Sequence, residues 1–372
     1  MKLTSFSNLL LFSLIITILF ALTMTLSCKK EDKKPEPTTT VTIYEVQYQT
    51  PGVDGSMVTA SGIVMVPPTN WTESFPLISV QHGTIFDRNV APSYGEKCGE
   101  AQAWYSEVVS NGYIVVMADY IGLGQAGITY HPYFHAQTEA TSTRDMIRAA
   151  RQLCTEKGVG INDKLFLAGY SQGGNVTAAL QRLLERDYPQ EFKITASAIM
   201  AAPFDLEMLW DFQVETPNPI SSVVNGLMIR CYKEIYDIGD SYSDFLVEPY
   251  DSLIPQLMDF EHNEDSVTQA LSSPPKDIFY SQFLDEVKAG TNIFAEKIRI
   301  NEVYDWSPQA PTIIVYSQAD EVIPFAMELM AYNHMKELGG NVDTISTGNT
   351  LNHMDGFPVA MIVAKEFFDT FK

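Results

Sequence analysis

Short apolar runs alternate with longer segments of helical periodicity along most of this 372-residue chain. The first two runs flank the turn sequence P-G-V-D-G at residues 51–55, so they are predicted to form an antiparallel hairpin. Short strands that alternate with helices favour a mainly parallel sheet with right-handed crossovers. Up to residue 202, strands are predicted at 41–48, 56–66, 75–80, 113–118, 164–169 and 195–202, and helices at 100–110, 138–157 and 172–184.

The alternation stops near residue 205 and returns after residue 306. Between these points the pattern is helical, with aromatic, acidic and proline residues mixed. An insertion of this length between two strands of one sheet is expected to cover the carboxyl ends of the strands, where ligands bind in open α/β sheets. The sequence thus predicts an α/β domain at 41–204 and 307–372, with a mainly parallel central sheet flanked by helices, and a largely helical cap at 205–306. Beyond the cap, strands are predicted at 311–316 and 342–346, and helices at 324–338 and 358–371.

The amino end has the layout of an export signal, with an apolar block at 9–22 and small residues ahead of Cys28. It resembles a bacterial lipoprotein signal, which implies that residues 1–27 are removed and that Cys28 becomes a lipidated first residue. Thr25 departs from that pattern, because an aliphatic residue is usual there. The alternative is an uncleaved membrane anchor, since 9–26 is just long enough to span a bilayer. Either reading places the folded part outside the cytoplasm, held at the cell envelope or surface, with secretion as the alternative.

Composition and charge narrow the class of partner. Residues 28–40 are charged, proline-bearing and without large apolar groups, so they predict a flexible tether. Over the whole chain, 45% of the residues are hydrophobic and 19% are charged, as in a folded globular protein. The 24 basic and 46 acidic side chains give a net charge of -22, which excludes a nucleic-acid partner because phosphates would be repelled. We interpret the acidic excess as a source of solubility.

The sequence G-Y-S-Q-G-G at residues 169–174 stands between a predicted strand and a predicted helix. A serine at such a sharp turn is held in a strained backbone with its hydroxyl exposed. Gly169 and Gly173 remove the Cβ atoms that would collide with the flanking strand and helix. This context, more than the short motif itself, predicts that Ser171 is a nucleophile.

A serine hydroxyl needs a neighbouring imidazole to remove its proton, and the imidazole needs a carboxylate to fix its tautomer. In chains with this type of elbow, the acid and then the histidine follow the serine. Asp320 stands in the turn just past the strand at 311–316, and His353 stands in the loop after the final strand. We predict that Asp320 is the orienting acid and His353 is the base.

Three other carboxylates compete with Asp320. Asp205 follows the strand at 195–202, where some enzymes with this elbow place the acid, and it is the main alternative. Glu321 would point in a different direction, one residue further on, and Asp355 follows the histidine on the same loop. Asp320 is preferred because its D-x-V-x-P-like context after the penultimate strand is the usual position of the acid.

Acyl transfer also needs hydrogen-bond donors for the oxyanion of the transition state. The backbone N–H of Gln172 is one candidate, since it follows the nucleophile at the start of a helix. The backbone N–H of Thr84, in the H-G-T turn after the strand at 75–80, is the second. The alternative for this turn is that Gly83 only permits a tight bend.

The sequence H-P-Y-F-H at residues 131–135 spaces two histidines like metal ligands on a helix, but Pro132 lies between them. No cluster of cysteine, histidine and carboxylate residues supports a metal site. We therefore interpret His131 and His135 as packing or substrate-contact residues, and predict neither a metal nor a cofactor.

The elbow, the H-G turn, the D-Y-x-G-x-G after the strand at 113–118, the D-W-S-P-Q-A-P before the strand at 311–316 and the late histidine together resemble the α/β-hydrolase superfamily. Within it, the place of the cap is similar to the secretory lipase group that includes the Candida lipase A type. The resemblance covers the chain from about Val41 onward. It implies a serine hydrolase that cleaves carboxylic esters through an acyl-enzyme, without a cofactor, and acts on a small-molecule or lipid ester.

Two alternatives stay open at this point. A peptidase of the same fold would use the same three side chains, because the triad accepts an ester or an amide. A surface binding protein that kept the fold and lost the chemistry is the other alternative, although such proteins usually lack a member of the triad.

Overall fold

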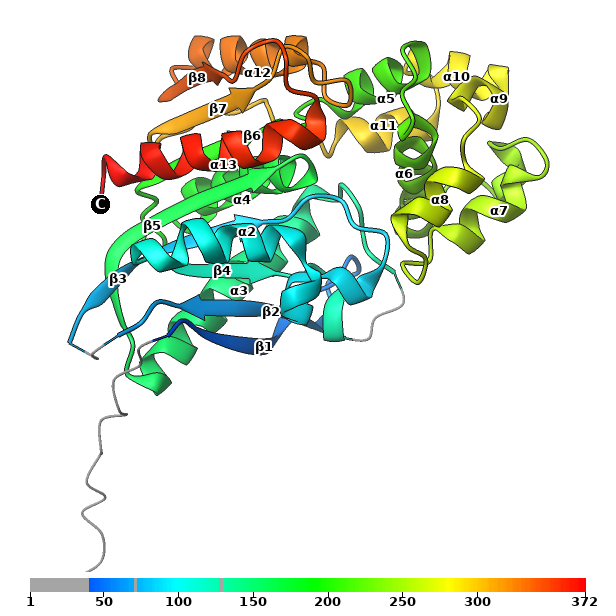
Figure 1. Cartoon of the computed structure of the whole chain (residues 1–372). Helices are drawn as coiled ribbons and strands as arrows, with labels where there is room; N and C mark the ends of the chain where they lie inside the picture. The colour runs from blue at the N-terminus through cyan, green and yellow to red at the C-terminus, as the bar shows by residue number, and fades with distance from the viewer. Residues whose placement is uncertain (1–39, 70–71, 127–129) are drawn as a thin grey trace, which may run out of the picture. The chain divides into compact units, whose positions relative to one another are not determined.

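An eight-stranded sheet lies at the centre of the described structure (Figure 1). The computed structural model describes residues 40–69, 72–126 and 130–372. The strands lie in the order β1-β2-β4-β3-β5-β6-β7-β8. Their bounds are β1 Thr42–Pro51, β2 Met57–Val66, β3 Ser74–Gln81, β4 Ile114–Ala118, β5 Gly160–Tyr170, β6 Ala196–Met200, β7 Thr312–Tyr316 and β8 Val342–Ser346.

The sheet is antiparallel at one edge and parallel elsewhere. β1 and β2 pair antiparallel, with Thr42 opposite Val66, so the predicted hairpin is confirmed. β2 also pairs antiparallel with β4, and every pairing from β4 across to β8 is parallel. The sequence prediction of a mainly parallel sheet is therefore confirmed.

Helices cover both faces of this sheet, which explains why the inner strands are apolar on both sides. Along β5, Leu165 and Leu167 face the same core as α3, α4 and α12, whereas Phe166 and Ala168 face α2 and α13. Figure 1 shows α2 and α13 together on one side of the sheet. The bounds of these helices are α2 Gly99–Glu107, α3 Ala136–Lys157, α4 Gln172–Asp187, α12 Phe325–Glu337 and α13 His353–Asp369.

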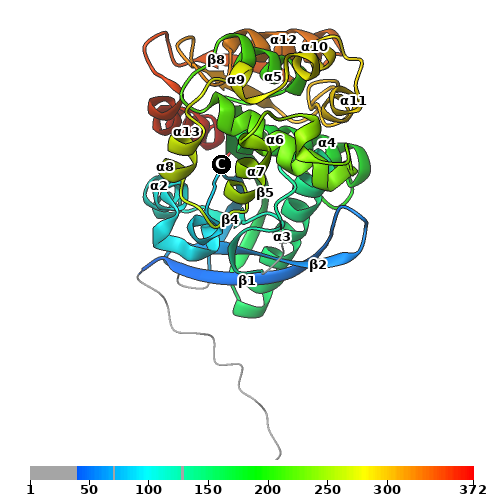
Figure 2. The ribbon, with the colours of Figure 1, turned by 90° about the vertical axis from the view of Figure 1, so that its right-hand side faces the viewer.

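The chain between β6 and β7 forms a helical insertion, which gathers to one side of the sheet (Figures 1 and 2). It has an aromatic core, in which Trp210 packs against Phe279 and Phe294 at ring-centroid distances of 5.2 and 4.7 Å. Its role as a cap stays a prediction. The helices are α5 Leu206–Glu215, α6 Ser221–Tyr236, α7 Tyr250–Leu257, α8 Glu264–Ala270, α9 Pro275–Ile278, α10 Ser281–Lys288 and α11 Ile293–Arg299.

The last helix, α13, begins earlier than the sequence predicted. We expected it to start at Pro358 and expected His353 in the preceding loop, and this was wrong, because His353 is the first residue of the helix. Asn352 caps the helix by accepting a hydrogen bond from the N–H of Asp355 at 2.8 Å. Pro358 is tolerated inside the helix, although it offers no N–H to the carbonyl of Met354.

None of the helices in the described residues combines the length and the apolar character that a membrane span requires. The predicted signal at 1–27, Cys28 and all but the end of the predicted tether at 28–40 lie outside the described residues. The other three cysteines, Cys98, Cys154 and Cys231, are buried free thiols. The 3-10 helices span Arg88–Val90, Pro92–Lys97, Val109–Asn111, Gly124–Ala126 and Tyr242–Asp244.

Candidate active site

Ser171 occupies a strained turn between β5 and α4. Its backbone lies at φ 57° and ψ −124°, outside the regions that non-glycine residues normally adopt, and its N–H donates to the carbonyl of Met200 at 3.0 Å. A Cβ on Gly173 would lie 2.0 Å from the carbonyl oxygen of Gln81, and a Cβ on Gly169 would lie 2.1 Å from that of Gly173. Both elbow glycines are therefore required by close backbone packing.

Three side chains from separate parts of the chain meet at this turn: Ser171 after β5, Asp320 after β7 and His353 at the start of α13. The hydroxyl of Ser171 is 2.9 Å from Nε2 of His353, and Nδ1 of His353 is 2.8 Å from Oδ2 of Asp320. A carboxylate can only accept here, so Nδ1 carries the proton and Nε2 is free to accept the hydroxyl proton of Ser171. This arrangement can turn a serine hydroxyl into a nucleophile.

The carboxylate of Asp320 is fixed by its own loop. Its other oxygen, Oδ1, accepts from the N–H groups of Val322 and Ile323 at 2.9 and 2.8 Å. Asp320 is 7% exposed and His353 is 5% exposed, so their contact is shielded from water. A shielded hydrogen bond to a charged group is stronger than one in water.

The competing carboxylates make other contacts. Asp205 is the N-cap of α5 and accepts from the N–H of Met208 at 2.8 Å. Glu321 accepts from the backbone N–H of His353 at 3.0 Å, so it contacts the main chain and leaves the ring to Asp320. Asp355 is exposed in the first turn of α13.

Tyr170 also positions the histidine, and the sequence analysis did not assign it a role. Its hydroxyl donates to the carbonyl oxygen of His353 at 2.6 Å. Its place just before the nucleophile was the only available signal, because the partner lies far away in the sequence. Glu321 and Tyr170 together fix the backbone of His353 at both its N–H and its carbonyl.

The two predicted oxyanion donors lie beside Ser171. Thr84 and Ser171 line the same cavity, and Gln172 is the first residue of α4. Within the described parts of the chain, the backbone N–H groups of Thr84 and Gln172 have no acceptor. Two N–H groups without a partner can bind a developing oxyanion.

Glu100 lies next to this turn, and the sequence analysis missed it. Its Oε1 accepts from the N–H of Gly83 at 2.8 Å, so that N–H is not available to an oxyanion. Burial raises the pKa of Glu100 to about 7. A Cβ on Gly83 would lie 2.9 Å from this carboxylate and 3.8 Å from the Cβ of Ser171, so Gly83 is needed for close packing as well as for the bend.

A cavity of about 150 Å³ opens above Ser171 and His353. Its walls are mostly apolar, and they come from the sheet loops, from the start of α13 and from helices of the insertion. Such a cavity favours an apolar group next to the nucleophile. The insertion and its flanking loops contribute Pro203, Leu209, Ile220, Val224 and Glu264, and the remaining apolar wall includes Phe86, Tyr133, Phe134, Val322, Ile323 and Phe357.

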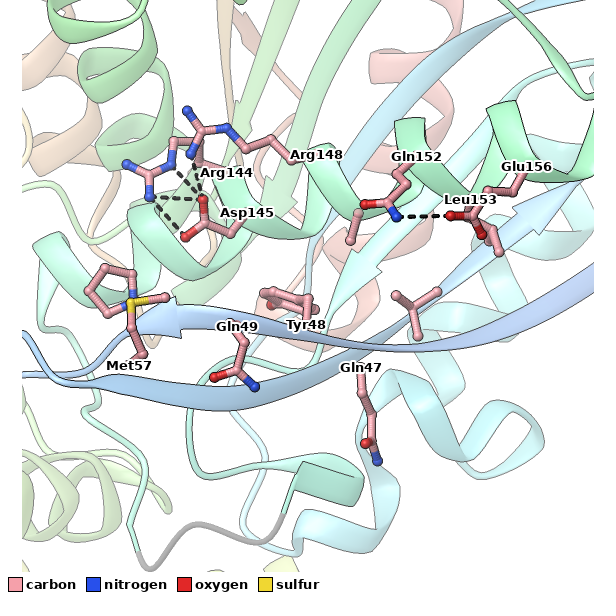
Figure 3. A pocket seen from close by; sticks show the side chains of 13 residues that line it. Gln47, Tyr48, Gln49, Met57, Arg144, Asp145, Arg148, Gln152, Leu153 and Glu156 are labelled. Atoms are coloured by element: carbon pink, nitrogen blue, oxygen red, sulfur yellow. Dashed lines mark hydrogen bonds and ion pairs between the residues drawn. The ribbon is translucent and has the colours of Figure 1, made fainter.

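A larger hollow of about 620 Å³ lies away from the serine, between β1 and α3 (Figure 3). Its two arginines are already paired, since Arg144 and Arg148 both contact Asp145 at 2.8 Å. Ser171 and His353 both line the smaller cavity. Volume alone would therefore select the wrong site.

His131 and His135 make protein contacts of different kinds. Nε2 of His131 is 2.9 Å from the side-chain Nε2 of Gln172, and Nδ1 of His135 is 2.8 Å from the hydroxyl of Thr138. Across the residues that the structure describes, no three His, Cys, Asp or Glu side chains are grouped to hold a metal ion.

Comparison with known proteins gives the family. A sequence model of the secretory lipase family matches residues 101–368. The chain belongs to the secretory lipase family. Its members are ester hydrolases, and the prediction of a carboxylic ester hydrolase is confirmed.

Individual similar proteins agree with this assignment. The secreted triacylglycerol lipase LIP4 of Malassezia globosa is 23% identical over 327 residues, which are 83% of this chain and 67% of that protein. A Legionella pneumophila protein with a solved crystal structure is 32% identical to this chain in sequence, and the two structures have a TM-score of 0.85 with 92% of both chains covered. The rice cell wall degrading esterase LipA of Xanthomonas oryzae is 25% identical, with a TM-score of 0.82 over 95% of this chain and 96% of that one.

The predicted resemblance to the Candida lipase A type is confirmed at the level of the fold. Candida antarctica lipase A in its closed state has a TM-score of 0.70 at 16% identity, over 91% of this chain and 81% of that chain. The secretory family and the secreted Malassezia relative also support an extracellular location for this lipase family member.

Proposed function

We propose that this secretory lipase family member hydrolyses carboxylic esters through an acyl-enzyme formed on Ser171. The observation that carries the proposal is the chain of two hydrogen bonds from Ser171 through His353 to Asp320, at 2.9 and 2.8 Å. The substrate is a small-molecule or lipid ester, and no metal or cofactor takes part.

In the first half of the reaction, the Oγ of Ser171 attacks the ester carbonyl while its proton moves to Nε2 of His353. The N–H groups of Thr84 and Gln172 bind the oxyanion. The C–O bond to the alcohol then breaks, and His353 returns the proton to the leaving alcohol. The acyl group stays on Ser171.

In the second half, a water gives its proton to His353 and attacks the acyl carbonyl. The bond from the carbonyl carbon to Oγ breaks, His353 protonates Oγ, and the acid leaves. Asp320 stabilises the imidazolium in both halves and stays ionised throughout.

Substitution of Ser171 by alanine tests this role. We expect Ser171→Ala to reduce p-nitrophenyl ester turnover to background, because within the described residues no other hydroxyl forms a hydrogen bond with Nε2 of His353. Ser197→Ala is the matched control, since Ser197 lies within the neighbouring strand β6, fully buried and without a hydrogen-bond partner for its hydroxyl in the described chain. Retained turnover in Ser171→Ala with an intact fold would refute the serine mechanism.

The insertion at 205–306 acts as a cap over the catalytic domain at 41–204 and 307–372 in this proposal. Leu209, Ile220 and Val224 of the insertion line the cavity, so this segment helps to select the acyl or alcohol group. The named relatives act on triacylglycerol and on rice cell wall material. Turnover of a panel of esters graded by acyl length would show whether this protein prefers long-chain or short-chain acyl groups.

A lipid on Cys28 anchors the protein outside the cytoplasm in this proposal, with residues 28–40 as the tether. The support is the order of apolar block, small residues and cysteine at the amino end. Cys28→Ser is expected to move the protein from the membrane fraction to the medium or the soluble envelope fraction. An unchanged membrane fraction would favour the uncleaved anchor at 9–26.

Amide hydrolysis is a second candidate, because Glu100 and Glu264 line the cavity and a carboxylate could pair with a substrate amino group. Parallel assays with aminoacyl arylamides and acyl esters separate the two reactions. Faster turnover of the arylamides would favour the peptidase.

A further inference from the structure

The segment His131–His135, which leads into α3, contacts both residues predicted to supply oxyanion donors, Gln172 and Thr84. His131, Tyr133 and Phe134 are each at most 2% exposed. Its contacts to the site are made by side chains that the mechanism above does not use. They are therefore candidates for a role beyond packing.

One contact fixes Gln172. The side-chain Nε2 of Gln172 lies 2.9 Å from Nε2 of His131 and 2.6 Å from Oε1 of Glu139, and all three residues are 1% exposed. An amide nitrogen only donates, so Nε2 of His131 must accept. The proton of His131 is then on Nδ1, which donates to the carbonyl of Ile121 at 3.0 Å. Burial agrees with this neutral ring, because it lowers the pKa of His131 to about 3.

A second contact fixes Thr84. The hydroxyl of Tyr133 is 2.9 Å from the hydroxyl of Thr84. Thr84 lies in the loop that follows β3, and this loop has no regular structure. This hydrogen bond therefore helps to set the position of Thr84, whose backbone N–H is a predicted oxyanion donor.

The segment itself is held in a strained conformation. Phe134 has a φ of 53°, which is unfavourable for an aromatic residue. Its N–H donates to Oε1 of Glu139 at 3.2 Å, and its carbonyl accepts from the hydroxyl of Tyr232 in α6 at 3.0 Å. Strain that is held by several hydrogen bonds is commonly found next to functional sites.

We propose that the His131–His135 segment, together with Glu139, is the positioning element of the oxyanion hole, which acts on Gln172 through its side chain and on Thr84 through its hydroxyl. The inference rests on the proposed function. None of these side chains touches the reacting atoms. They set the separation and direction of two backbone N–H groups that stabilise charge only in the transition state.

Two variants test the two contacts, one each, without removing a backbone donor. Tyr133→Phe removes the hydroxyl that holds Thr84, and Gln172→Met removes the amide that contacts His131 and Glu139 while the backbone N–H of residue 172 remains. Each variant is expected to lower kcat for a p-nitrophenyl ester roughly tenfold with KM within about twofold, since loss of a whole donor costs about 10²- to 10³-fold. Tyr113→Phe is the control, because Tyr113 is equally buried but donates to Asp369 on the other face of the sheet.

The inhibition constant of phenylboronic acid provides a second measurement, which should not change if these side chains only stabilise the fold. The boronate forms a bond to Oγ of Ser171 and places an oxygen in the oxyanion hole, so its inhibition constant is expected to rise by the same factor as kcat falls. Thr84→Val breaks the same hydrogen bond as Tyr133→Phe, so the double variant is expected to equal either single variant.

The outcomes separate this inference from the proposed function. Wild-type kcat and boronate inhibition in both Tyr133→Phe and Gln172→Met would overturn the positioning role. An equal loss in the Tyr113→Phe control, or a rise in KM without a fall in kcat, would also overturn it. Ser171→Ala is assayed in parallel, and only its retained turnover would count against the serine mechanism itself.

Discussion

At the scale of single residues, hydrogen-bond capacity distinguishes the carboxylates near the site. Asp320 uses one oxygen for the ring of His353 and the other for two backbone N–H groups. Asp205 uses its side chain to cap α5. Two aspartates that follow neighbouring strands β7 and β6 thus have different partners, and their substitution should affect different properties.

Asp320→Asn is expected to lower kcat by about 10⁴-fold with an intact fold, because the amide no longer holds the imidazole in the required tautomer. Asp205→Asn is the matched variant. It keeps a capping side chain, so we expect near wild-type kcat and a change in the free energy of unfolding of less than about 1 kcal/mol. Steady-state kinetics and urea denaturation measure both. A larger loss of kcat in Asp205→Asn would move the acid to that residue.

At the scale of elements, the active site depends on how closely α4 approaches β3 and β5. The Gly173 Cα position faces the carbonyl of Gln81 at the end of β3, with no room for a Cβ. This contact places the start of α4, and with it the N–H of Gln172, against the turn that carries Thr84. The elbow is therefore a packing contact between three elements.

Gly173→Ala is expected to lower the free energy of unfolding by about 3 kcal/mol, because a Cβ 2.0 Å from a backbone oxygen forces the helix away from the strand. Gly99→Ala is the control at the start of α2, where an added Cβ would meet nothing within 4 Å. Chemical denaturation gives both values. Equal stability of the two variants would show that the elbow tolerates a side chain.

The sequence predicted most elements because their signals are local. The hairpin followed from a proline and glycine turn, and the elbow from a strand, a G-x-S-x-G and a helix in succession. The start of α13 was misplaced because Pro358 looked like a first helical residue, while the capping role of Asn352 was overlooked.

The supporting contacts of the site could not be predicted in the same way. The partners of Tyr170 and Glu100 are distant in the sequence, and a single carboxylate at the start of a helix gives no sign that it will accept from Gly83. The H-P-Y-F-H segment was noticed for its histidines, but its tyrosine contact to Thr84 depends on a loop placement that no local pattern encodes.

At the scale of the whole molecule, the protein contains further carboxyl groups that are buried or partly buried, in addition to Asp320. Burial raises the pKa of Glu139 to about 8 and that of Glu100 to about 7, and it raises the pKa of Glu328 well above its usual value. A carboxyl group with a raised pKa favours the folded state when it is protonated. Its stabilising contribution is complete below the unfolded pKa and is lost as the pH rises through the folded pKa.

For Glu139 this window extends from the usual 4.5 to about 8. We expect the free energy of unfolding of the wild type to fall across it, with a contribution from Glu139 of at most about 1.4 kcal/mol per pH unit. Glu139→Gln cannot ionise, so its stability should fall less steeply between pH 5 and pH 8. Urea denaturation at each pH unit measures the difference, and identical slopes would contradict the raised pKa.

The most direct measurement for the central claim is covalent labelling of the intact protein with a fluorophosphonate, followed by mass spectrometry of its peptides. Attack by an activated serine predicts a single adduct on Ser171, its loss in Ser171→Ala and slow labelling in Asp320→Asn. An adduct on another residue, or an unlabelled wild-type protein that still hydrolyses esters, would contradict an acyl-enzyme on Ser171.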